Sequence, residues 1–181
     1  MLKFISKLLG GNKSEKDVAQ IKPIVEKINK YFAEYASLSN DALRNKTQEF
    51  RATIKAYLTD IDGQIAAKQQ EADNLPATDI HAKDAIYQQV DKLKKERDKK
   101  IEEVLQNILP EAFAVVKETA RRFSNNAEVM ATATDLDREL SVKKEYISIK
   151  DNQSVFQNSW TAGGTKITWN MVHYDVQLIG G

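Results

Sequence analysis

Residues 86–108, IYQQVDKLKKERDKKIEEVLQNI, decide the expected fold because apolar side chains recur in them at steps of four and three. The repeat consists of Ile86, Val90, Leu93, Arg97, Ile101, Val104 and Ile108, with Arg97 as its polar member. This pattern is typical of a helix whose narrow apolar face packs against another helix. Its basic run, KLKKERDKK, is interleaved with acidic residues at helical spacing, so we interpret it as a solvated face and predict no nucleic-acid partner.

A second apolar repeat precedes this stretch. Its residues are Ile54, Leu58, Ile61 and Ile65, and the break NLPATD at residues 74–79 separates the two repeats. Two such helices joined by a short turn are predicted to fold back as an antiparallel coiled-coil hairpin. We expect Leu58 to lie near Leu93. Ile65 is expected to lie near Tyr87.

The composition excludes several classes of function. The 181 residues are 41% hydrophobic and 29% charged, with a net charge of +1, so no global basic field points to nucleic acid. The absence of Cys excludes disulfides, Cys-containing zinc sites and thiol nucleophiles. The two histidines, His81 and His173, stand far apart in the sequence and outside any metal-binding spacing, so no metal site is predicted.

Further helices flank the predicted hairpin. Residues 15–35 keep a helical apolar period, with Pro23 at a kink or near a restart, and Ser39 or Asn40 can cap the helix that follows. Pro110 suits the first turn of another helix, which we expect to be among the best buried. The residues predicted to face inward from that helix are Ala112, Phe113, Val116, Ala120 and Phe123.

A β-rich stretch follows the last of these helices. The sequence ATATDLDREL predicts a short helix capped by Thr, and EYISIKDNQSVFQNSW alternates with period two around a turn at Asp151–Asn152, as in a β-hairpin. TKITW is a possible third strand after Gly163–Gly164. The predicted fold class is therefore mainly α (α+β): long helices that include a coiled-coil hairpin, and a small β-rich insert near the C-terminus.

The first eleven residues, MLKFISKLLGG, are predicted to form a short amphipathic helix that ends at the Gly pair. Its apolar face comprises Leu2, Ile5, Leu8 and Leu9, and its basic residues are Lys3 and Lys7. Two interpretations stay open: the helix docks on the protein's own core, or it binds an anionic membrane surface.

Two other motifs are weak evidence for chemistry. TAGGTKIT has Thr165 where a Walker A sequence would pair Gly directly with Lys, so a β-turn is the better interpretation. Asp135, Asp137 and Glu139 would suit a divalent ion on an extended chain, but on a short helix their side chains diverge and capping is simpler. We therefore predict no catalytic residue and no metal ligand.

The last residues, MVHYDVQLIGG (171–181), place apolar side chains before a Gly pair, so we expect the sequence to stop within a domain. Together with LPEAFAVVKETARR (109–122), this segment closely resembles the N-terminal part of the SecA family, the ATP-driven motor of bacterial preprotein export. LSNDALRNKTQEFR (38–51) and PIVEKIN (23–29) add to the resemblance. The family's phosphate-binding Walker A loop comes a short way beyond the Gly pair, so the chain is expected to be an N-terminal fragment.

The resemblance implies a nucleotide site of which this chain holds one end. By position, Tyr174 would lie by the adenine base and Gln177 would pair with its edge, while Val172 stands where the family usually has Arg. ATP with Mg²⁺ is the expected cofactor of the complete protein. Without Walker A and Walker B sequences, the fragment alone is expected to lack turnover and tight nucleotide binding.

The resemblance also divides the chain. The expected parts are an amphipathic helix (1–11), N-terminal helices of the motor (12–56), a coiled-coil hairpin insertion (57–107), a helix on the motor core (108–123), a β-rich insertion (124–170) and the start of the nucleotide-binding domain (171–181). The implied partners are the SecYEG channel, unfolded preprotein and anionic lipid, on the cytoplasmic face of the inner membrane. The alternative is a non-enzymatic coiled-coil interaction module in which DVQLIGG forms the last core strand and Gln177 bonds only to backbone.

Overall fold

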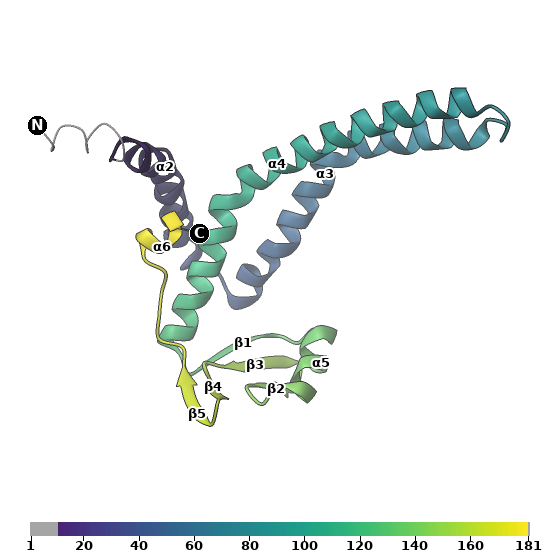
Figure 1. The fold of residues 1–181 in the computed structure, drawn as a ribbon. Coiled ribbons are helices and arrows are strands. Elements are labelled where there is room, and N and C mark those ends of the chain that lie inside the picture. The colour runs from purple at the N-terminus through teal and green to yellow at the C-terminus, as the bar shows by residue number, and fades with distance from the viewer. Residues whose placement is uncertain (1–10, 181) are drawn as a thin grey trace, which may run out of the picture. The chain divides into compact units, whose positions relative to one another are not determined.

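The computed structural model describes residues 11–180 and has the predicted fold class (Figure 1). Its helices are α2 (Gly11–Tyr35), α3 (Asn40–Asn74), α4 (Ile80–Asn125), α5 (Asp135–Lys143) and α6 (Asp175–Gly180). Its strands are β1 (Glu128–Thr132), β2 (Ile147–Lys150), β3 (Gln153–Gln157), β4 (Ser159–Ala162) and β5 (Thr165–Thr168). The membrane-facing residues predicted within positions 1–9 lie outside the described residues. Long helices with a small set of antiparallel strands confirm the mainly α class.

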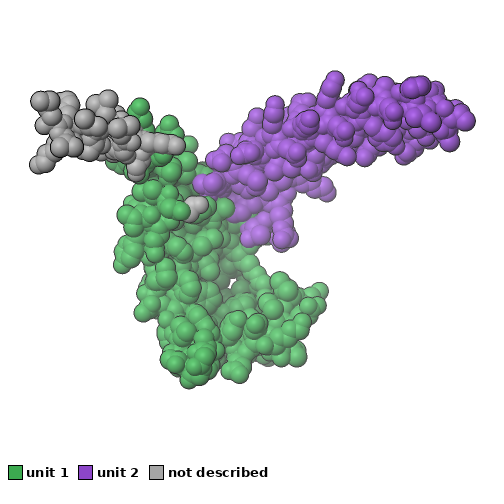
Figure 2. Space-filling view, viewed as in Figure 1, with its two compact units in different colours: residues 1–46, 110–181 green, residues 47–109 purple. Residues whose placement is uncertain are grey.

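The chain forms two compact units, residues 47–109 and the remainder (Figure 2). Residues 47–109 contain parts of α3 and α4, which pack against each other along an apolar seam. Leu58, Ile61, Ile65 and Val90 are buried in this seam, and Ile54, Leu93 and Ile101 pack against them. The heptad residues therefore form the core of the unit, as their spacing predicts.

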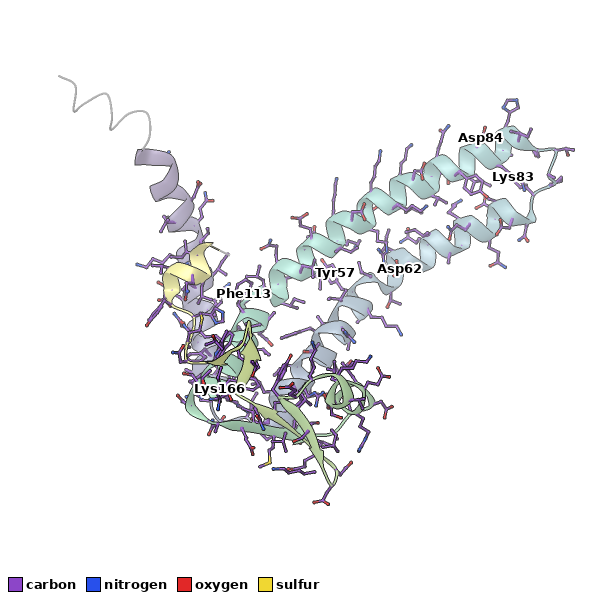
Figure 3. All side chains as sticks on the ribbon, turned by 60° about the horizontal axis from the view of Figure 1, so that its bottom comes forward. Tyr57, Asp62, Lys83, Asp84, Phe113 and Lys166 are labelled. Atoms are coloured by element: carbon purple, nitrogen blue, oxygen red, sulfur yellow. The ribbon has the colours of Figure 1, made fainter. Side chains whose placement is uncertain are left out.

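Two bonds between the helices show their register. The Tyr57 hydroxyl donates to Glu103 at 2.8 Å, and Arg97 pairs with Asp62 at 2.5 Å; Figure 3 shows Tyr57 and Asp62 along α3. The two pairs show that the helices are antiparallel. They place the helical turn of α4 around Ile101, and not Leu93, opposite Leu58 of α3. The two residues share the seam, but they are not a facing pair. The observed pairing of the two helices is therefore shifted along their axes from the pairing that we expected, which was roughly symmetric about residues 74–79.

The second unit has its own core, built by α2, the start of α3, the end of α4 and α6. Its buried residues are Val25, Ile28, Tyr35, Leu43, Ala114 and Leu178. α2 continues through Pro23 without a restart. The Arg122 guanidinium donates to the carbonyls of Tyr35 and Leu38, which satisfies acceptors where α2 ends.

Two expectations for the helix at 108–123 are wrong. Pro110 lies inside α4 and not at a helix start, so the hairpin helix and the following helix are one element. An interior proline loses its N–H bond and crowds the carbonyl four residues before it, but buried side chains on both sides, such as Val104 and Ala114, stabilise a continuous helix despite that cost. The predicted inward face is wrong only in part: Ala120 is buried and Phe113 packs against the core as expected, but Val116 is 57% exposed. The buried face also includes Ala114, Lys117 and Glu118, which were not predicted.

The β-rich stretch forms two separate sheets. β2 and β3 pair as the predicted hairpin around Asp151–Asn152, but the third strand of their sheet is β1, in the order β1-β3-β2. The expected third strand, β5, pairs instead with β4 in a two-stranded sheet. Gly163 and Gly164 make the turn between β4 and β5 with φ of +56° and +78°, which confirms the β-turn interpretation of TAGGTKIT.

Among residues 11–180, no helix combines the length and the apolar character needed to cross a membrane.

Candidate functional site

The two residues expected at the nucleotide lie at the start of α6: Gln177 is in the helix, and Tyr174 directly precedes it. Tyr174 precedes its first turn, and its carbonyl accepts from the amides of Gln177 and Leu178 at 2.9 and 3.1 Å. The Gln177 Oε1 accepts from the Tyr174 amide at 2.9 Å, as the third residue of a capping box does. DVQLIG is therefore a helix and not the core strand that the alternative expected. The Gln177 side chain does bond to backbone, as the alternative expected, but this bond to the Tyr174 amide caps a helix.

An apolar contact docks α6 on the unit that contains it. Leu178 is 7% exposed and lies in the core with Val25 and Ile28 of α2, and Ile179 packs against the same cluster. Val176 on the same helix is 74% exposed. The helix therefore has one buried apolar face and one solvent face.

A polar cluster of three residues holds the first turn of α6. The Asp175 Oδ1 accepts from the Asn29 Nδ2 of α2 at 3.0 Å and lies 3.5 Å from the Lys117 Nζ of α4. Lys117 also donates to the Asn29 Oδ1 at 2.7 Å. The Asn29 bond and the nearby Lys117 charge hold the pKa of Asp175 below its ordinary value.

Both predicted adenine contacts are exposed. Tyr174 is 74% exposed, and Gln177 is also at the surface. An aromatic ring can cover the apolar face of a base, and an amide offers the donor and acceptor that match the edge of adenine. Because an amide oxygen has two lone pairs, Gln177 can keep its cap and still accept from a ligand. Val172 is partly buried and supplies no charge.

A pocket of about 530 Å³ lies in the same unit, between α4 and the β-rich stretch. Its aromatic lining consists of Phe123, Tyr146, Phe156, Trp160 and Trp169, and His173 also borders it. The His173 Nδ1 is buried, and it has no hydrogen-bond partner among the described residues. Sequence patterns did not predict this pocket, because its walls come from α4, β3, β4 and residues outside these elements, which are separate in the chain.

The acidic trio behaves as its capping interpretation predicts. Thr134 caps α5, and its amide and hydroxyl donate to the buried carboxylate of Asp137. Arg44 also bonds that carboxylate, while Asp135 and Glu139 are exposed. Within residues 11–180, no cluster of His, Asp and Glu side chains is arranged to hold a metal ion.

Comparison with known proteins identifies the family. The model of the SecA DEAD-like domain matches residues 5–181. The protein translocase subunits SecA of Christiangramia forsetii and Phocaeicola vulgatus are each 47% identical to the chain, over 99% and 98% of its length. That of Amoebophilus asiaticus is 41% identical over all of it. The chain spans 16% of the length of each of these relatives. No solved structure matches the chain significantly. The chain belongs to the SecA DEAD-like domain family.

Proposed function

We propose that the chain is the part of a SecA-type motor that holds the adenine end of its ATP site. The complete motor would couple ATP hydrolysis to the passage of unfolded preproteins through the SecYEG channel. The observation that supports this function most strongly is the family match, which covers nearly the whole chain and includes α6. The relatives are protein translocase subunits, and the chain spans 16% of their length.

The roles proposed at the site follow from side-chain chemistry. Tyr174 stacks on the base, and Gln177 holds the amino group and a ring nitrogen of adenine with its amide oxygen and nitrogen. Guanine presents the opposite pattern at that edge, so the same amide would discriminate ATP from GTP. The exposure of both side chains supports these roles, because the base needs no rearrangement of the core to reach them.

The chain alone is proposed to lack ATPase activity. Its sequence has no Walker A loop, and phosphate and Mg²⁺ contacts supply most of the affinity and the transition-state stabilisation in motors of this type. The residues present fit only the base end of the nucleotide. The 181-residue chain should therefore bind ATP negligibly in a calorimetric titration.

Membrane association is proposed to depend on residues 1–11. Their apolar side chains would enter the headgroup boundary while Lys3 and Lys7 meet anionic lipid, at the cytoplasmic face of the inner membrane. Sedimentation with anionic vesicles should show reduced binding when these residues are removed. Equal binding by the shortened and intact chains would contradict this role.

Substitution of Gln177 tests the nucleotide site directly. In a full-length protein that carries this chain, Gln177→Ala should weaken ATP binding by about 1–3 kcal/mol and reduce the preference for ATP over GTP. Gln177→Glu keeps an oxygen to cap α6 but loses the amide donor, so it separates base recognition from helix capping. Val176→Ala, at an exposed neighbour, is the matched control. Unchanged nucleotide preference in both Gln177 variants would refute the proposed site.

A further inference from the structure

Lys117 is a buried cation next to the candidate site. Its side chain is 9% exposed, although most lysines on a helix extend into solvent. Its Nζ lies 2.7 Å from the Asn29 Oδ1, 3.5 Å from the Asp175 Oδ1 and 5.0 Å from the centroid of the Phe32 ring. A buried ammonium is costly unless such partners compensate for its lost hydration, so these contacts restrict where Asp175 can lie.

Asn29 uses both ends of its amide in the same cluster. Its oxygen accepts from Lys117 and its nitrogen donates to Asp175 at 3.0 Å. Rotation of the amide would exchange donor and acceptor and lose both bonds. Asn29 therefore links the side chains of α4 and α6 in one orientation.

These bonds act two residues before Gln177, in the same helical turn. Leu178 fixes the depth of α6 in the core, but an apolar contact has no strong directional preference. A hydrogen bond does have one, so the Asn29 bond to Asp175, which Lys117 holds in place through Asn29, restricts how the first turn is rotated about the helix axis. That rotation sets the direction in which the Gln177 amide points.

We propose that Lys117 and Asn29 are positioning residues for nucleotide selectivity: they orient α6 through Asp175, so that the Gln177 amide meets the edge of adenine. This inference rests on the proposed function of Gln177. It adds residues of α2 and α4, distant in sequence, to a site otherwise confined to the segment around α6. Neither Lys117 nor Asn29 needs to contact the nucleotide.

The first experiment measures α6 directly in the 181-residue chain. Lys117→Met keeps the length of the side chain and a favourable contact with Phe32, but loses the charge and the donor. Amide hydrogen exchange at Gln177 and Leu178 should become about tenfold faster, because their bonds to the Tyr174 carbonyl open more often. Lys117→Arg should restore most of the protection. Lys166→Met, at an exposed lysine of β5, is the control.

The second experiment measures selectivity in a full-length protein that carries this chain. Lys117→Met should reduce the ATP preference over GTP by about fivefold, with a larger rise in KM for ATP than fall in kcat. Asp175→Asn removes the charge from a side chain that is 60% exposed, so it leaves the core intact and should produce a smaller change in the same direction. Combined with Gln177→Ala, Lys117→Met should cause no further loss of selectivity.

The possible outcomes separate the two proposals. If Gln177→Ala changes selectivity and both Lys117→Met and Asp175→Asn leave it unchanged, the positioning role is overturned and the nucleotide site stands. If α6 exchanges equally in Lys117→Met and wild type, the polar cluster does not hold the helix and the inference is also overturned. If neither Gln177 variant alters selectivity, the proposed function fails, and the positioning inference fails with it.

Discussion

A single buried carboxylate organises the junction between α3 and the β-rich stretch. Asp137 is 2% exposed, and its oxygens accept from Arg44 at 2.7 Å, from the Thr134 amide at 2.8 Å and from the Ser154 hydroxyl at 2.8 Å. Burial alone would raise the pKa of Asp137, but the bonds from Arg44, Thr134 and Ser154 outweigh it and hold the pKa well below its ordinary value. Asp137 is therefore charged at neutral pH.

Asp137→Asn should destabilise this unit by about 2–4 kcal/mol, because one amide nitrogen would then face donors instead of accepting from them. Urea unfolding at neutral pH measures the loss, with Asp135→Asn, at an exposed acid in the same helix turn, as the control. Equal midpoints for the two variants would contradict the role of this carboxylate.

The same substitution predicts a specific acid response. Since the folded pKa of Asp137 lies below the unfolded value of about 4, its stabilisation is complete above that value and is lost as pH falls toward the folded pKa. The difference in stability between wild type and Asp137→Asn should therefore shrink below about pH 4. If the difference in stability between the two proteins stayed constant from neutral pH to acid, the charge of Asp137 would not be the source of the stabilisation.

At the scale of elements, the hairpin of α3 and α4 owes its stability to its seam. Val90 and Ile61 are each 1% exposed there, whereas Leu93 is only partly buried. The charged residues on the outer faces add little, because exposed ion pairs are weak. A change within the seam should therefore affect the hairpin much more than a change on its surface.

Val90→Asp should unfold the hairpin by placing a charge in this seam, with a cost of about 3 kcal/mol or more. Leu93→Asp should have a smaller effect because its side chain retains access to water. Circular dichroism of the compact unit 47–109 measures the loss of helix, and Gln88→Asp, at an exposed position of α4, is the control. A Val90→Asp variant with the wild-type melting curve would show that the seam is misassigned.

At the scale of the whole molecule, unfolding of the two compact units can be followed separately with different spectroscopic probes. Both tryptophans, Trp160 and Trp169, belong to the unit outside residues 47–109. Much of the helix content belongs to the hairpin. Fluorescence therefore follows one unit, and circular dichroism follows both.

Unfolding of the complete chain should accordingly fail the two-state test. In urea, the fluorescence transition and the far-ultraviolet circular dichroism transition should have different midpoints. Val90→Asp should shift the dichroism curve while leaving the fluorescence curve nearly unchanged. Coincident curves in both proteins would mean that the chain unfolds as one cooperative unit.

Sequence patterns predicted elements well where the local chemistry is sufficient. The Thr134 cap and the turn at Asp151–Asn152 depend on neighbouring residues, and the structure confirms both. β1 was missed because Glu128–Thr132 is short and its alternation is weak, so its pairing with β3 decides its conformation. The helix through Pro110 was missed because a proline preference for first turns is a local rule that long-range packing overrides.

The candidate site was predictable only in part. Tyr174 and Gln177 came from a family resemblance, which gives positions but no conformation. Lys117 was missed because a lysine in a helix usually faces water, and only the fold brings it to Asn29 and Asp175. Burial of a charge depends on partners far away in the sequence, and periodicity carries no information about them.

The bond between the Asn158 amide and the Ala127 carbonyl, at 2.9 Å, extends the pairing of β1 with β3 by one step. The backbone thus leaves the end of α4 and returns to almost the same point, with antiparallel neighbours about 5 Å apart. Residues 128–157 therefore form a segment whose two ends are neighbours in the sheet. If this segment were deleted or replaced, a short loop could join its two ends, and the entropic cost of closing such a short loop is modest. The base of the sheet is therefore the point at which this segment could be removed with the least disturbance to the end of α4.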